Sequence, residues 1–74
     1  MRIAYDLKAD ALYIQFREGK VNRTREVREG LLIDMDAEGR LYGIEILGVS
    51  ERMDVRDLGR ISLELPIGKP TSSN

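Results

Sequence analysis

Apolar residues recur at every second position through most of this chain, and that pattern constrains the fold more than any other feature. A period of two is typical of a β-strand with one buried face, whereas an amphipathic helix repeats its apolar residues every three or four positions. In residues 11–16, Leu12 and Ile14 share one face and Tyr13 lies on the other. The same alternation predicts strands over residues 2–6, 11–16, 21–27, 31–36 and 40–46.

Short segments rich in turn residues separate these stretches. Residues 7–10 have the length and polarity of a hairpin loop, and Gly19 and Gly39 can each take the positive φ angle that a tight turn requires. Gly43 falls inside the stretch 40–46, where a glycine suggests a bulge or a close neighbour. Because every connection is short, we expect an antiparallel meander in which each strand pairs with the next.

The period changes after residue 48. Ser50 is a credible N-cap and Asp54 a second one, so we expect one short helix near residues 49–58. Alternation then returns and predicts a final strand near residues 60–66, with Pro66 at its end. Its apolar side would consist of Ile61, Leu63, Leu65 and, just beyond it, Ile67.

The predicted fold class is therefore α+β, mostly β: about five meandering strands, one short helix and a returning strand. A chain of 74 residues makes one domain. We expect this β-rich domain to span residues 1–67 and to be followed by a frayed C-terminal tail over residues 68–74.

The chain is small, so its core is small as well. A domain of this length buries only roughly 60–65% of the surface that its unfolded chain exposes. Disulfides and metals are common remedies, but the sequence has no Cys and no His. It therefore has no disulfide, and it lacks the usual ligands of zinc, haem and iron–sulfur clusters, so we expect no cofactor. Association with a second copy is the remaining remedy, and we expect a homodimer.

Charge and hydropathy argue against several classes of partner. The net charge is −1, which provides no overall attraction to nucleic acid or to anionic lipid. The apolar runs are only a few residues long, far short of a membrane span, and the N-terminal residues lack the apolar region of a signal peptide. We expect a cytoplasmic protein that does not bind membranes.

Residues 34–45 match the spacing of a calcium-binding loop. Asp34, Asp36 and Glu45 stand at the first, third and twelfth positions, and Gly39 at the sixth. A calcium loop needs a helix on each side, however, and both flanks here alternate with period two. We interpret the segment as the charged tip of a hairpin, with a weak cation site on Asp34, Asp36 and Glu45 as the alternative.

The stretch around residues 21–27 is β-branched but polar, which is typical of an edge strand. Two of its arginines are spaced by two residues, so they project from the same face. An arginine guanidinium can bind phosphate or carboxylate with two hydrogen bonds, so this edge is the candidate partner-binding site. Its residues are Lys20, Arg23, Arg25 and Arg28. Charge that protects an edge strand from aggregation is the simpler interpretation, and binding of nucleic acid through residues 20–28 is an alternative function.

Catalytic equipment is sparse. Asp6 and Asp10 flank the first turn, where carboxylates commonly accept backbone hydrogen bonds. Without His or Cys, no evident base is present to activate Ser50 or Thr24 as a nucleophile. We therefore predict no catalytic residue and no enzyme. A small hydrolase that uses Asp6, Asp10 or Asp34 stays open, and it requires two carboxylates with raised pKa in one pocket.

Five short stretches together resemble the widespread prokaryotic domain-of-unknown-function family 2283. They are Tyr5-Asp6, residues 10–14, residues 26–30, residues 34–39 and residues 43–47, so that the resemblance covers about residues 1–53. It implies a compact β-rich fold and no established catalytic residue. Some relatives are encoded beside small toxin-like proteins, which implies that such members are candidate antitoxins. This chain shows no helix-turn-helix or ribbon-helix-helix segment for operator binding.

The leading hypothesis from the sequence is a small non-enzymatic protein-interaction domain, for which the resemblance implies an antitoxin-like role. We expect it to be dimeric and to bind an unidentified protein partner through an exposed edge strand or an apolar sheet face. Nucleic-acid binding and a carboxylate-dependent hydrolase are the two alternatives.

Overall fold

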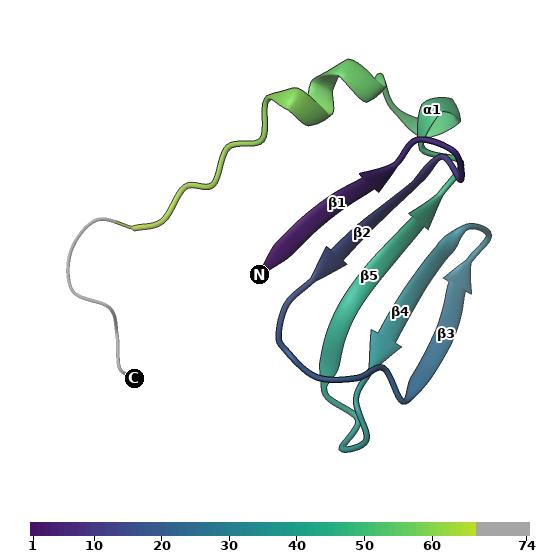
Figure 1. Cartoon of the computed structure of the whole chain (residues 1–74), viewed down its shortest axis with the longest axis vertical. Coiled ribbons are helices and arrows are strands. Elements are labelled where there is room, and N and C mark those ends of the chain that lie inside the picture. Colours follow the sequence, from purple (N-terminus) through teal and green to yellow (C-terminus); the bar gives the residue numbers. More distant parts are fainter. Residues whose placement is uncertain (67–74) are drawn as a thin grey trace.

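A computed structural model describes residues 1–66 and shows five antiparallel strands in one open sheet, with a short helix and a 3₁₀ turn at one end (Figure 1). The fold is mostly β, as predicted. The strands are β1 (Arg2–Asp6), β2 (Ala11–Gln15), β3 (Arg23–Arg28), β4 (Leu31–Met35) and β5 (Leu41–Leu47). They are followed by helix α1 (Val49–Arg52) and the 3₁₀ helix η1 (Val55–Gly59).

The order of the strands differs from a simple meander. The sheet runs β1-β2-β5-β4-β3, so β5 lies at its centre between β2 and β4. The hairpin β1–β2 and the meander β3–β4–β5 are local, but the contact that joins them pairs β2 with β5. The chain between β2 and β3 passes the ends of the two intervening strands (Figure 1). The expected pairing of β2 with β3 is therefore wrong, and β3 and β1 form the two edges.

The first hairpin forms as its sequence predicts. Asp6 and Ala11 are the last cross-strand pair, so the loop comprises residues 7–10. The carboxylate of Asp6 accepts hydrogen bonds from the N–H groups of Lys8 and Ala9, at 3.0 and 3.1 Å. Asp10 closes the turn with φ of 53°, a left-handed conformation that aspartate tolerates better than most residues.

The loop between β4 and β5 is the predicted charged hairpin tip. Asp36 receives the backbone N–H of Glu38 and of Arg40 on one carboxylate oxygen, both at 2.9 Å. Gly39 takes φ of 79° there, the left-handed conformation expected of it. Strands flank this loop on both sides, so the segment 34–45 is a hairpin and not a helix–loop–helix calcium site.

Gly43 lies at the crowded centre of the sheet. A Cβ atom on this residue would stand 2.5 Å from the carbonyl oxygen of Ile14 on β2, closer than such atoms can approach. The pairing of β4 with β5 also shifts at this point, because Asp34 pairs with Gly43 and Met35 with Leu41. Both the bulge and the close neighbour that an internal glycine suggests are confirmed.

Helix α1 begins differently from the prediction. Its N-cap is Gly48, with φ of 64° and no side-chain cap, so Ser50 lies inside the helix. Ser50 does not cap because its N–H and its hydroxyl are both bound to the carboxylate of Asp10. The prediction for Asp54 is confirmed, since its side chain accepts the N–H of Arg56 at the start of η1.

Residues 60–66 are extended but pair with no strand of the sheet (Figure 1). The prediction of a final strand is therefore wrong in this structure. Alternation gives the segment the side-chain pattern of a strand, but a strand also needs a hydrogen-bonding neighbour, and this one has none within residues 1–66. The predicted frayed tail, residues 68–74, lies outside the described residues.

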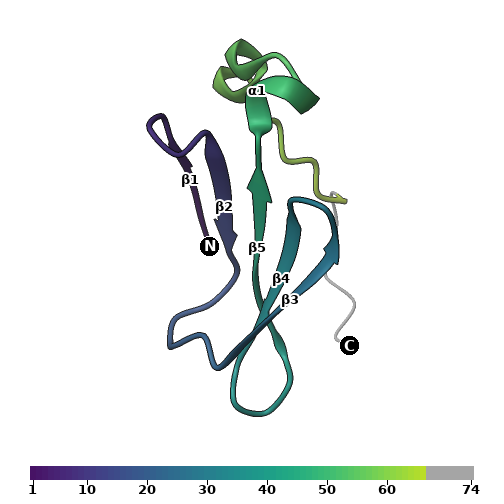
Figure 2. The same ribbon diagram turned by 90° about the vertical axis from the view of Figure 1, so that its right-hand side faces the viewer.

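The core is small because the sheet is a single layer (Figure 2). Among residues 1–66, only three apolar side chains are buried, namely those of Ala11, Leu12 and Val49. Val49 reaches its place because the start of α1 is held against the first hairpin, where the N–H of Val49 donates to the carbonyl of Asp10 at 3.1 Å. Among residues 1–66, no helix has the length and apolar composition needed to cross a membrane.

Candidate functional site: the two faces of the sheet

One face of the sheet is lined by aliphatic side chains from four neighbouring strands. Cross-strand partners point to the same side of a sheet, so the pairs Ile3–Ile14, Ile14–Ile44 and Ile33–Ile44 define this side. We call it the apolar face. Its residues are Ile3, Tyr5, Leu12, Ile14, Leu31, Ile33, Ile44 and Ile46.

No second layer covers this face within residues 1–66. A two-layer protein would bury these side chains completely, yet only Leu12 is buried, and the others are half-buried or, in the case of Ile3, 40% exposed. Helix α1 and η1 lie beyond the end of the strands and do not lie across them (Figures 1 and 2). Within residues 1–66, the apolar face therefore lacks the opposing layer that would complete a core.

Arginines line one side of the apolar face. In the register of β3 with β4, Arg23 lies opposite Met35, Arg25 opposite Ile33, and Arg28 opposite Leu31. These three arginines, the basic rim, point to the same side as the aliphatic residues because a bulge at Val27 brings Arg28 into the series. The predicted edge strand is confirmed, and its arginines are exposed. Lys20 lies in the loop before β3, outside the rim.

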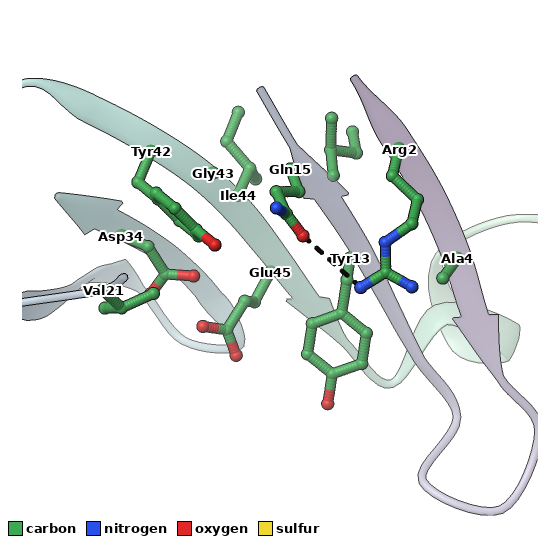
Figure 3. Close-up of a pocket in the computed structure, with 11 residues that line it drawn as sticks. Arg2, Ala4, Tyr13, Gln15, Val21, Asp34, Tyr42, Gly43, Ile44 and Glu45 are labelled. Carbon is green, nitrogen blue, oxygen red and sulfur yellow. Dashed lines mark hydrogen bonds between the residues drawn. The ribbon is translucent and has the colours of Figure 1, made fainter. Parts of the chain in front are cut away.

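The opposite face, the polar face, contains a shallow hollow of about 210 Å³ (Figure 3). Gly43, at the centre of the sheet, is one of the residues that line it. Arg2 and Gln15 meet across one side of it, with 3.4 Å between Nη2 and Oε1. The other polar side chains around it are Tyr13, Asp34, Tyr42 and Glu45. The hollow is smaller than the roughly 300–1,000 Å³ typical of pockets for small-molecule ligands.

Two carboxyl groups share this hollow. Asp34 is only 6% exposed, so it does not belong to the charged hairpin tip that the sequence predicts for this segment. Its neighbours enclose it, and the hydroxyl of Thr24 on β3 donates to Oδ1 of Asp34 at 2.7 Å. Glu45, on β5, faces Asp34 (Figure 3). Hydrogen bonding to Asp34, then burial, then repulsion between the two charges raise the pKa of Glu45 to about 7.

Asp36 stands apart from that pair. Its carboxylate is occupied by the turn and by the guanidinium of Arg40, whose Nε lies 2.9 Å from Oδ2. The backbone N–H of Arg40 is the largest cause that lowers the pKa of Asp36. Within residues 1–66, no three His, Cys, Asp or Glu side chains gather closely enough to hold a metal ion. A cation at the predicted site would therefore find Asp34 and Glu45 together, without Asp36.

Asp10 has a structural role that the sequence did not indicate. The hydroxyl of Tyr5 donates to its Oδ1 at 2.6 Å, and the hydroxyl of Ser50 donates to its Oδ2 at 2.7 Å. These bonds favour the ionised form, and they lower the pKa of Asp10. Asp6 serves the turn alone. The structure therefore does not bring Asp6 and Asp10 together as an acid–base pair, and the pair that it does form is Asp34 with Glu45.

The sequence does not predict that Thr24, Asp34 and Glu45 form one cluster. It gives part of the information, because Asp34 and Glu45 both fall on the polar positions of their strands. Placing them side by side required the register of β4 against β5, which the loop length alone did not fix.

The fold and the two faces define a class: a small open antiparallel β-sheet domain whose apolar face is left uncovered by residues 1–66. A family model described as "Protein of unknown function (DUF2283)" matches residues 2–50, and the chain belongs to that family. The match includes all five strands and the first residues of α1, and it leaves out η1 and the segment after it. Searches of the curated proteins and of the solved structures found no match.

Proposed function

We propose that this protein is a small, non-enzymatic, cytoplasmic interaction domain that binds protein through the apolar face of its sheet. One observation carries the proposal: four neighbouring strands present aliphatic side chains that nothing covers within residues 1–66. An uncovered apolar surface with a polar border is typical of a protein-binding site.

The basic rim supports the same proposal. Arginine is enriched at protein interfaces, because its stem packs on apolar surface while its guanidinium binds carboxylates at the border. Arg25 and Ile33 are cross-strand partners, so the charged border adjoins the aliphatic centre directly. A partner that fits would be apolar at its centre and acidic on one side. A toxin-like protein is one such partner that the family resemblance implies.

The test uses two neighbouring residues of β4 that point to opposite faces. Ile33 belongs to the apolar face and Leu32 to the polar face. Both become Thr, a β-branched residue that suits a strand. We expect that proteins captured by the wild type from its native cell extract are lost with Ile33→Thr and retained with Leu32→Thr. Equal retention by both variants would show that the apolar face is not the binding surface.

The small carboxylate-dependent hydrolase is a second candidate, and the Asp34–Glu45 pair favours it. Glu45, with a pKa of about 7, is poised to exchange a proton near neutral pH beside a buried carboxylate. The small volume of the hollow speaks against it. Hydrolysis of p-nitrophenyl esters and glycosides compares the two candidates. An interaction domain predicts the same background rate for the wild type and for Glu45→Gln, whereas an enzyme predicts a rate that Glu45→Gln abolishes.

A further inference from the structure

The segment of residues 61–65 exposes its apolar side chains to an unusual degree. Ile61, Leu63 and Leu65 are 58, 74 and 71% exposed. They follow η1 on an extended stretch that runs away from the sheet (Figures 1 and 2). Three large aliphatic side chains in a row of five residues form an apolar surface that a folded monomer rarely leaves open.

The sequence of this segment has the pattern of a β-strand that buries one of its two sides. Ile61, Leu63 and Leu65 alternate with Ser62 and Glu64, so an extended backbone puts the aliphatic residues on one side and the polar residues on the other. The side that Ile61 and Leu63 share has no partner within residues 1–66. Residues 1–66 therefore present two apolar surfaces that no other part of this described stretch covers, the apolar face and this segment.

The accessible surface of the chain is larger than that of a compact monomer of the same mass. The accessible surface is 6250 Å² for a chain of 8.4 kDa. A folded monomer of that mass exposes roughly 4,600 Å², so the excess is roughly 1,600 Å². A stable interface of ordinary size buries roughly 800 Å² on each partner, and obligate dimers bury more. The excess belongs to the whole chain, and a dimer interface of ordinary size would cover the part of it on the apolar face and residues 61–65.

The radius of gyration also exceeds that of a compact chain. The radius of gyration is 14.5 Å, whereas a compact chain of this length has a radius of about 11 Å. An open single layer and a projecting segment both contribute to the difference.

We propose that a second copy of this chain covers the apolar face, and that residues 61–65 of each copy pack against the sheet of the other. The proposal rests on the proposed function, because it names the occupant of the same face. Each copy has one apolar face and one segment of residues 61–65, so two copies can cover both surfaces of each other. A two-fold axis makes the two sets of contacts identical. The net charge of −1 on each chain opposes this association only weakly.

Adjacent residues of the segment provide the matched test. Leu63→Lys puts a charge on the apolar side, and Ser62→Lys puts the same charge on the polar side. Both side chains are exposed in the single chain, so neither change affects its folding. Sedimentation across micromolar concentrations should show a dimer. Leu63→Lys should raise its dissociation constant by about tenfold or more, while Ser62→Lys leaves it unchanged.

Hydrogen exchange provides a second readout. In the dimer, the amides of residues 61–65 should exchange more slowly than in the diluted monomer, because the segment gains contacts only on association. A chain that sediments as a monomer throughout, or a dimer that Leu63→Lys and Ser62→Lys affect equally, overturns the proposal. If the chain is a monomer and Ile33→Thr still abolishes capture of another protein, the dimer is overturned and the proposed function stands. If Ile33→Thr has no effect either, both are overturned.

Discussion

The carboxylate of Asp10 binds both the backbone N–H and the hydroxyl of Ser50, a residue 40 positions further along the chain. This contact ties the first hairpin to the start of α1. It lies next to Val49, the largest side chain that is fully buried. The junction between hairpin and helix therefore holds together the only closed part of the core in the described chain.

Asp10→Asn should lower the melting temperature at neutral pH. Asn tolerates the positive φ of this position, so the change removes the charge and one acceptor and leaves the backbone unstrained. The pKa of Asp10 is lowered in the folded protein, so its contribution is present above the unfolded value of 3.8 and is lost as pH falls through the folded value. The difference in melting temperature between wild type and variant should therefore narrow in acid. Asp57→Asn, at an exposed position, is the control, and circular dichroism measures the melting.

The Asp34–Glu45 pair predicts that stability depends on pH in the direction opposite to that of Asp10. The pKa of Glu45 is raised in the folded protein, from 4.5 to about 7, so the folded state holds a proton that the unfolded state releases. Stability should therefore fall as pH rises through this window. The full shift corresponds to about 3 kcal/mol, and solvent screening of this half-buried group reduces the expected loss to about 1 kcal/mol.

Glu45→Gln removes that titration. Its amide can still donate a hydrogen bond to Asp34, so the variant should be more stable than the wild type above neutral pH and less dependent on pH below it. Urea denaturation at several pH values measures both effects, and Glu18→Gln at an exposed position provides the comparison. A wild-type stability that stays flat between pH 4.5 and about 7 would contradict the assignment of the shared proton.

Gly43 and Gly59 predict opposite outcomes for the same substitution. Gly43→Ala would place a methyl group 2.5 Å from a backbone oxygen of β2, so the central strands would have to move. We expect a loss of about 2 kcal/mol or more in the free energy of unfolding. Gly59→Ala meets nothing within 4 Å and should change stability by less than about 1 kcal/mol. Similar urea midpoints for the two variants would refute the crowding at Gly43.

The sequence predicted the strands well because their information is local. Alternation and turn residues placed all five within two residues of their observed ends. The pairing of β2 with β5 was missed because periodicity tells which side a residue faces, and not which strand lies beside it. The same limit hid the enclosure of Asp34, which depends on Thr24 from β3 and Glu45 from β5.

The errors at the C-terminal side of the chain have a different cause. Ser50 has the chemistry of an N-cap, but Asp10 binds its N–H and its hydroxyl, and Gly48 begins the helix instead. Residues 60–66 have the alternation of a strand, yet within the described chain they find no edge with which to pair. The alternation predicts that the apolar side of this segment is buried. A second copy would bury it, whereas residues 1–66 of a single chain do not.

Binding of nucleic acid through the basic rim is the remaining alternative, and it can be tested directly. Three exposed arginines on β3 would attract phosphate, but they border an aliphatic face instead of a row of stacking aromatic rings. We expect no binding of single-stranded RNA or DNA at physiological salt, by fluorescence anisotropy with labelled oligonucleotides. Binding that weakens with salt, and that the double substitution Arg23→Ala and Arg25→Ala abolishes while Arg60→Ala preserves it, would make nucleic acid the partner of this edge.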